Sequence, residues 1–353
     1  MNAPLDKNMQ DVFAISKGQP MLPLSHSAPP AAPDDVFSFV RTPVQSDATA
    51  LAPAPAKSED VFIIGMNRPS VIPATAVPGV SPSSALLTIS NAEYHSMRDI
   101  VSTSMLKALL RSPAHMKAMY RKERKELPSQ RIGTGYHCAT LEPDRFLNEY
   151  VVYDGYRRGD KWELFRIANK GKTIITKDEY DTILGMREAT FAYTDYPLKK
   201  AIELGEAEQS IIWTDEETGV RCRIRPDLLL RDVAKLMLDL KSCGDCRPEE
   251  FKGQIFRMDY DLQAAMYIIG MHAFTGEWFP FYFVACEDED PYGVWVYEVL
   301  ASEADEIYMS GLKKLRRALE LYKRCVENDH WPKYASPYTS SGCLHIPKYL
   351  LGN

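Results

Sequence analysis

The sequence predicts an α/β protein in which a central mixed β-sheet is flanked by helices and preceded by a disordered N-terminal tail. Composition changes near residue 86, strand-like alternation fills much of 210–241, and helix-like periodicity lies on both sides of that stretch. The 353 residues are 45% hydrophobic and 25% charged, which is enough apolar content for a sizeable core.

The predicted tail covers residues 1–85, and the predicted folded domain covers 86–353. More than half of the 24 prolines lie in the tail, whereas all 19 tyrosines and all 5 tryptophans lie after it. Alternating Ala and Pro cannot donate a regular set of backbone hydrogen bonds or bury enough surface to offset the entropy of ordering. The tail repeats the triplet Asp-Val-Phe, which is either chance in a biased composition or a docking motif for a partner.

Several classes of protein are disfavoured by the sequence. No run approaches the ~20 apolar residues that span a bilayer, and no basic segment followed by an apolar stretch opens the chain. The 7 cysteines are odd in number and scattered, unlike a disulfide framework. We therefore expect a reduced, cytoplasmic protein with no membrane partner.

The helices and strands of the folded domain are predicted from the periodicity of hydrophobic residues and from residues typical of helix caps and turns. Ser102-Thr103-Ser104 offers helix caps, and turn signals lie at 217–219 and 231–232. Helices are expected at 102–126, 133–141, 177–193, 250–274 and 302–327. Strands are expected at 210–214, 220–230, 234–241, 280–286 and 293–300.

The stretch 220–241 carries the residues that point to chemistry. Asp239 and Lys241 lie two residues apart and therefore share one face of a strand, while Asp227 interrupts the preceding strand after Pro226. A tight hairpin between the two strands brings Asp227 toward this pair. Two carboxylates and an ammonium on an apolar strand need a neutralising partner, and Mg²⁺ accepts one or two carboxylates together with phosphate oxygens.

These residue types suit phosphodiester hydrolysis. Asp227 and Asp239 would hold a metal that orients water and stabilises charge on a phosphate. Lys241 would position or help deprotonate that water, or neutralise the developing charge. An ordinary Asp–Lys pair on a surface hairpin is the alternative reading of the same spacing.

The ordered motifs resemble the PD-(D/E)XK nuclease superfamily, and more narrowly its RecB and lambda-exonuclease branch, including the RecE-type exonuclease (exonuclease VIII). Pro226-Asp227 and Asp239-Leu240-Lys241 match the signature, and the resemblance covers roughly 90–350. Three further segments are similar to motifs of that branch: the helical His motif at 133–137, the Gln-x-x-x-Tyr motif at 263–267 and the opening helix of the RecE-type domain at 104–115.

The resemblance implies a restriction-endonuclease-like core and a metal-dependent DNA exonuclease. Such an enzyme uses Mg²⁺, for which Mn²⁺ can substitute, and degrades one strand of linear duplex DNA from the 5′ end. The implied partners are double-stranded DNA ends, a single-strand annealing protein of the RecT type, and further copies of the chain in a ring. A phage or prophage origin and a bacterial cytoplasm are implied with it.

The resemblance also assigns roles to individual residues. His137 would be a metal ligand, although a lone histidine is often a core residue. Gln263 would face the metal, and Tyr267 would face DNA or the supporting shell. Glu208 is a possible accessory acid. Arg223 and Arg225 would contact phosphates from the basic face of their strand, unless they only solvate it.

Other features leave alternatives open. With a net charge of −6, DNA binding would need clustered basic residues. One such cluster spans 107–131, and a second comprises Lys313, Lys314, Arg316 and Arg317. Cys243 and Cys246 form a lone Cys-x-x-Cys, a weak indication of a metal or an iron–sulfur cluster. An endonuclease, a single-strand nuclease and a non-catalytic DNA-binding module are the competing functions.

Overall fold

The computed structural model describes residues 84–119, 121, 128–232 and 234–334, so the predicted tail up to residue 83 lies outside the described residues. The helices are α2 (Asn91–Ser96), α3 (Thr103–Arg111), α4 (Pro113–Ala118), α5 (Pro128–Leu141), α6 (Pro143–Glu149), α7 (Gly159–Ala168), α8 (Lys177–Ala192), α9 (Leu198–Leu204), α10 (Pro248–Arg257), α11 (Tyr260–Thr275) and α12 (Glu306–Glu327). The strands are β1 (Ala85–Leu87), β2 (Tyr150–Val152), β3 (Thr173–Ile175), β4 (Glu206–Ala207), β5 (Ser210–Thr214), β6 (Arg221–Ile224), β7 (Leu228–Leu230), β8 (Leu236–Cys243), β9 (Phe281–Glu287) and β10 (Val294–Val299).

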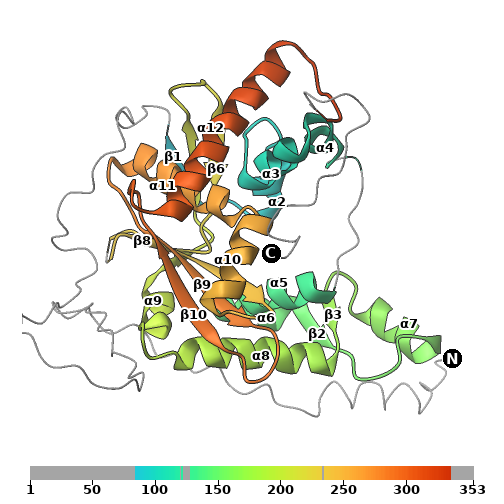
Figure 1. The fold of residues 1–353 in the computed structure, drawn as a ribbon. Helices are drawn as coiled ribbons and strands as arrows, with labels where there is room; N and C mark the ends of the chain where they lie inside the picture. Colours follow the sequence, from blue (N-terminus) through green and yellow to red (C-terminus); the bar gives the residue numbers. More distant parts are fainter. Residues whose placement is uncertain (1–83, 120, 122–127, 233, 335–353) are drawn as a thin grey trace, which may run out of the picture.

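A five-stranded mixed sheet forms the centre of the molecule. Its strand order is β10-β9-β8-β7-β4, in which β8 and β9 run parallel and the other neighbours run antiparallel. Helices α8 and α9 lie along one side of this sheet, and α10, α11 and α12 lie on the other (Figure 1). The predicted α/β architecture with a central mixed sheet flanked by helices is confirmed.

A second, three-stranded sheet has the order β1-β5-β6. The strand expected over 220–230 is therefore two strands that belong to different sheets. The break falls at 225–227, where Pro226 has no N–H to donate to a strand ladder. Crossing between sheets at this point places Asp227 where the two sheets meet.

The main core lies between the two sheets and is centred on α11. Nearly the whole of this helix is buried, which explains a run of apolar residues with no polar stripe. Against it pack Trp213 of β5 and Phe281 of β9. Helix α12 approaches α11 closely at Gly311, where a Cβ atom would lie 1.9 Å from the carbonyl oxygen of Asp261.

A second core covers the opposite face of the five-stranded sheet. Tyr136 of α5 and Met186 of α8 pack there against Leu238 and Leu240 of β8 and Tyr282 of β9. Beyond α5, a small parallel pair of β2 and β3 and the helix α7 extend to one side (Figure 1). Neither strand of this pair was expected from the sequence.

Two helices that the sequence predicts as continuous are each broken. The 102–126 segment divides at Ser112, whose extended backbone ends α3 and whose side chain caps the His115 amide of α4, while residues 120 and 122–127 are outside the described residues. The 250–274 segment divides at Asp259, which has a φ of 51°. Helix α11 therefore starts at Tyr260 and points its first turns in a new direction.

Candidate active site

The predicted convergence of Asp227 with the Asp239 and Lys241 strand is present. The antiparallel register pairs Leu228 of β7 with Leu238 of β8, so Asp227 lies opposite the middle of β8. The backbone amide of Leu240 donates a hydrogen bond of 2.8 Å to Asp227 Oδ2. Strand pairing therefore fixes one carboxylate directly beside the other.

Asp239 is fully buried and is held from two elements. Lys241, two residues along β8, forms an ion pair with Asp239 Oδ2, and Gln263 Nε2 of α11 donates 2.7 Å to Oδ1. Burial by itself would lower the pKa of Lys241, but Asp239 and Asp227 outweigh burial and hold that pKa above its ordinary value. Lys241 is thus a protonated ammonium at neutral pH.

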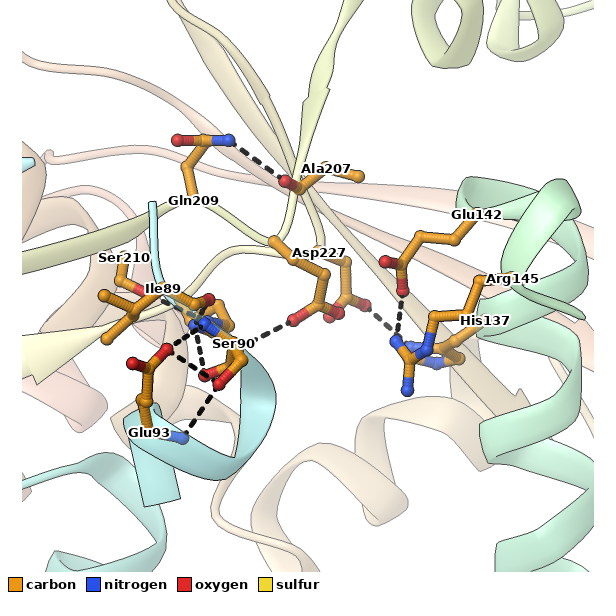
Figure 2. A network of polar contacts seen from close by, with 12 residues as sticks. Ile89, Ser90, Glu93, His137, Glu142, Arg145, Ala207, Gln209, Ser210 and Asp227 are labelled. Atoms are coloured by element: carbon orange, nitrogen blue, oxygen red, sulfur yellow. Dashed lines mark hydrogen bonds and ion pairs between the residues drawn. The ribbon is translucent and has the colours of Figure 1, made fainter. Parts of the chain in front are cut away.

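His137 comes to the same place from α5. Its Nδ1 lies 3.2 Å from Asp227 Oδ2, the oxygen that also accepts from Leu240 (Figure 2). Burial and the neighbouring Lys241 lower the pKa of His137, so the imidazole is neutral at pH 7. Gly133, one turn earlier, permits the close approach, since a Cβ there would lie 3.0 Å from Ser242 Oγ of β8.

Glu208 lies beside this group, in the link between β4 and β5. Its amide donates 3.1 Å to the carbonyl of Asp227, and its carboxylate lies 3.6 Å from Arg225 Nη1. Burial, with a contribution from the charge of Asp227, raises the pKa of Glu208 to about 7. Glu208 therefore stands near the site, where the sequence analysis placed an accessory acid.

The expectation that Arg223 and Arg225 form an exposed basic strand face is wrong. Both are buried, because β6 is covered on both of its sides and only its first residue, Arg221, is exposed. Arg225 donates to Ser210 Oγ and to the Ile89 carbonyl at 2.8 Å each, and Arg223 donates to the Met97 carbonyl. The two guanidinium groups hold the segment around α2 against β6 and are not displayed to a DNA strand.

Both guanidinium groups also lie over the ring of Tyr94 in α2, at 4.7 Å for Arg223 and 4.4 Å for Arg225. The helix that carries this ring begins with a capping box, in which Ser90 and Glu93 satisfy each other's backbone amides (Figure 2). Arg225 binds the backbone just before that cap. The arginines therefore stabilise the wall next to the site.

Of the two positions proposed for Tyr267, the structure places it in the supporting shell, not on a DNA-facing surface. It is buried, and its hydroxyl donates 3.0 Å to the carbonyl of Arg225. That carbonyl lies two residues before Asp227. Tyr267 thus fixes the crossing between the sheets from which Asp227 projects.

Two further residues lie near the site: Tyr260, which has no role predicted from the sequence, and Lys107, which the sequence places only in the basic cluster 107–131. The ring of Tyr260 lies beneath the Lys241 ammonium, with Nζ 4.8 Å from the ring centroid. Lys107 of α3 approaches the same ring at 4.9 Å. Tyr260 lies three residues before Gln263 on one helical face, a spacing visible in the sequence, but the approach of α3 depends on tertiary packing.

Two of the four residues in the second predicted basic cluster are paired with neighbouring carboxylates. Lys314 lies 2.6 Å from Asp259 and 2.9 Å from the buried Asp261, and Arg316 lies 2.6 Å from Asp215. These ion pairs bind α12 to α11 and to the loop after β5. The charges of Lys314 and Arg316 therefore hold the fold together.

The donor chemistry of the site suits a divalent cation. Burial and the nearby Asp239 raise the pKa of Asp227 well above its ordinary value, the sign of carboxylates that lack a compensating cation. Neutral His137 offers a nitrogen beside them. Among the described residues no ready-made group of three such ligands occurs, and Asp239 contacts Lys241 and Gln263.

The Cys-x-x-Cys segment follows β8 but does not contribute to this group. Cys243 and Cys246 are buried free cysteines, and the Cys243 thiol donates to the Cys286 carbonyl. Burial raises the pKa of Cys243 to about 12 and that of Cys246 to about 11, so both remain thiols. In the described part of the chain no cluster of metal-binding side chains surrounds them.

Residues 102–339 match the family described as a PDDEXK-like domain of unknown function (DUF3799). The chain belongs to this family. The membership confirms the predicted PD-(D/E)XK relationship, and the matched range includes Asp227, Asp239 and Lys241. No helix in the described ranges is both long and apolar enough to cross a membrane.

Comparison with other proteins gives a distant structural likeness. A crystal structure described as a "Putative exonuclease" from Eubacterium rectale is 14% identical, with a TM-score of 0.48, over 69% of this chain and 88% of that one. No curated protein matches the sequence.

Proposed function

We propose that this protein is a metal-dependent nuclease that hydrolyses phosphodiester bonds at the site formed by Asp227, Asp239, Lys241 and Gln263. The observation that carries the proposal is the protonated Lys241, which is paired with the buried Asp239 and also feels the charge of Asp227, in a PDDEXK-like domain. A structural salt bridge needs only one carboxylate, Asp239. The second carboxylate, Asp227, has a pKa that burial and the neighbouring Asp239 raise, which is typical of a functional site.

Each residue has a role that follows from its contacts. Asp227, Asp239 and His137 would hold a divalent cation, which when bound makes water a better nucleophile and stabilises charge on the phosphate. Gln263 orients Asp239 through its 2.7 Å hydrogen bond. Lys241 is protonated and therefore suits stabilisation of the developing negative charge better than removal of a proton from water.

The finer proposal is an exonuclease acting on linear duplex DNA from the 5′ end with Mg²⁺ or Mn²⁺. It is supported by the resemblance of the motifs at 104–115, 133–137 and 263–267 to the RecE-type domain. On the same ground we propose a RecT-type annealing partner for the 3′ ends and a ring of identical subunits around DNA.

Digestion of 5′-labelled linear duplex DNA with Mg²⁺ and with EDTA tests the proposal. We expect release of labelled nucleotides with Mg²⁺ only, and a loss of at least ~100-fold in rate for Lys241→Ala, since an electrostatic group at the reacting phosphate is removed. Lys199→Ala changes an exposed lysine on α9 and serves as the matched control.

The substrates separate the competing functions. Cleavage of covalently closed circular DNA would replace the exonuclease proposal with an endonuclease, and digestion of single strands alone would indicate a single-strand nuclease. Undiminished turnover in Lys241→Ala would refute the site. Binding without cleavage of any of these substrates would leave a non-catalytic DNA-binding module.

A further inference from the structure

Helix α3 presents an outward stripe that is basic and carries no acidic residue. Its buried face consists of Thr103, Met105, Leu106 and Leu109, which pack into the core. Ser104 and Arg111 are exposed on the other side, and Lys107 is half-buried between them. These three lie at positions i, i+3 and i+7 and so share one face of the helix.

This stripe begins next to the active site. Helix α3 packs beside α11, with the Thr103 hydroxyl 3.3 Å from the Met266 sulfur. One turn later, Lys107 reaches the ring of Tyr260 at the start of α11, over which Lys241 also lies. Both ammonium groups are within 4.9 Å of one ring centroid, and the charge of Lys241 acts on the pKa of Lys107.

No described carboxylate lies within 4.0 Å of the Lys107 ammonium, and the same holds for the Arg111 guanidinium. By contrast, Lys117 is paired with Asp329 on the neighbouring helix ends. Burial lowers the pKa of Lys107 to about 8, and repulsion by Lys241 acts in the same direction. Asp239, Asp259 and Asp261 attract this cation from beyond ion-pair distance but do not outweigh its burial. An external anion that approached Lys107 would therefore be bound favourably.

We propose that Lys107 binds a backbone phosphate of the nucleic acid next to the phosphate that is cleaved, and that Arg111 binds the phosphate that follows along α3. The inference rests on the proposed nuclease function and adds two residues that would bind the nucleic acid next to the active site. Lys107 and Arg111 lie about one helical turn, ~5.4 Å, apart along α3, so a strand that runs along this helix brings its phosphates past both cations. Tyr260 keeps Lys107 and Lys241 in a fixed relation to each other.

Salt-dependent DNA binding tests this assignment. Fluorescence anisotropy of a labelled duplex in EDTA, which keeps the DNA intact, is measured over a series of salt concentrations for wild type, Lys107→Gln and Lys107→Arg. Lys107→Gln should weaken binding about tenfold and lower the slope of log K against log salt by ~0.9, the value for one lost phosphate contact. Lys107→Arg should keep the slope, and Arg111→Gln should lower it.

Lys199→Gln on α9 is the matched control and should leave both affinity and slope unchanged. If Lys107→Gln behaves like this control while wild type binds and cleaves DNA, the Lys107 assignment is overturned and the nuclease proposal stands. A weaker affinity at unchanged slope, with a lowered melting temperature, would show a packing role and would also overturn it. If wild type neither binds nor cleaves nucleic acid, both proposals fail.

Discussion

At the scale of single residues, the carboxyl groups of the site make the metal-free protein sensitive to pH. The pKa of Glu208 is about 7 in the fold against an ordinary 4.5, so the folded state holds its proton more tightly than the unfolded chain. The stability that this provides is complete below pH ~4.5 and is lost as the pH rises through ~7. The pKa of Asp227 is shifted in the same direction.

We therefore expect the melting temperature of wild type in EDTA to fall relative to that of Glu208→Gln between pH 5.5 and pH 8, because only wild type carries the carboxyl with the raised pKa. Thermal unfolding across that range measures both, with Glu203→Gln, an exposed carboxylate on α9, as the control. Added Mg²⁺ or Mn²⁺ should restore more stability at pH 8 than at pH 5.5, because the ligands are then deprotonated. Equal dependence of the melting temperature on pH for Glu208→Gln and wild type would show that Glu208 does not have a raised pKa in the fold.

The residues of the site were predictable where local spacing decides their position, and not where tertiary packing does. Asp239 and Lys241 share a strand face by their spacing alone, and Asp227 follows from the hairpin. Basic and apolar residues do alternate along the strand that carries Arg223 and Arg225. This alternation does not reveal that both faces of the strand are covered. The approach of Lys107 required knowing that α3 packs along α11.

At the scale of elements, the contact between α11 and α12 depends on one residue without a side chain. A Cβ at Gly311 would overlap the Asp261 carbonyl, so Gly311→Ala should force the helices apart and lower stability by about 1–3 kcal/mol. Gly253→Ala in α10 meets nothing within 4 Å and should instead stabilise the protein by about 0.5–1 kcal/mol. Denaturant unfolding of both variants measures the difference, and equal effects would contradict this account.

Element boundaries explain which parts of the fold the sequence predicts well. Strand β5 and helix α8 match the expected ranges closely, and a capping box marks the start of α8. The breaks at Ser112 and Asp259 are set by backbone conformations that hydrophobic periodicity does not report. The short strands β2 and β3 are three residues each, too few for a periodic pattern to identify them.

At the scale of the whole molecule, the folded part and the predicted tail meet at the first strand. Ala85, the last residue of the predicted tail, already pairs with Ile212 as part of β1. The carbonyl groups of Ile89 and Ser90 then receive the Arg225 side chain. The folded unit therefore begins slightly earlier than the composition indicates.

Removal of residues 1–83 should leave nuclease turnover and melting temperature unchanged, because all the site residues and the β1 pairing are retained. Removal of residues 1–90 should lower the melting temperature, since it deletes β1 and the partners of Arg225. Activity assays and thermal unfolding of the two shortened chains check this. Loss of activity on removing 1–83 would show that the tail takes part in the reaction.

The crossing between the two sheets at 225–227 limits how the active site could be grafted onto another protein. Asp227 belongs to the end of one sheet and the start of the other, and its position depends on Tyr267 from the helix between them. A hairpin of β7 and β8 excised with Asp227 and Asp239 would keep both acidic residues. It would lack Tyr267, whose hydrogen bond holds the backbone next to Asp227 in place. A transferable unit of this chemistry must therefore include both sheets, α11 and the α5 helix that carries His137. Changes of specificity are better sought on other surrounding helices than at the crossing between the sheets.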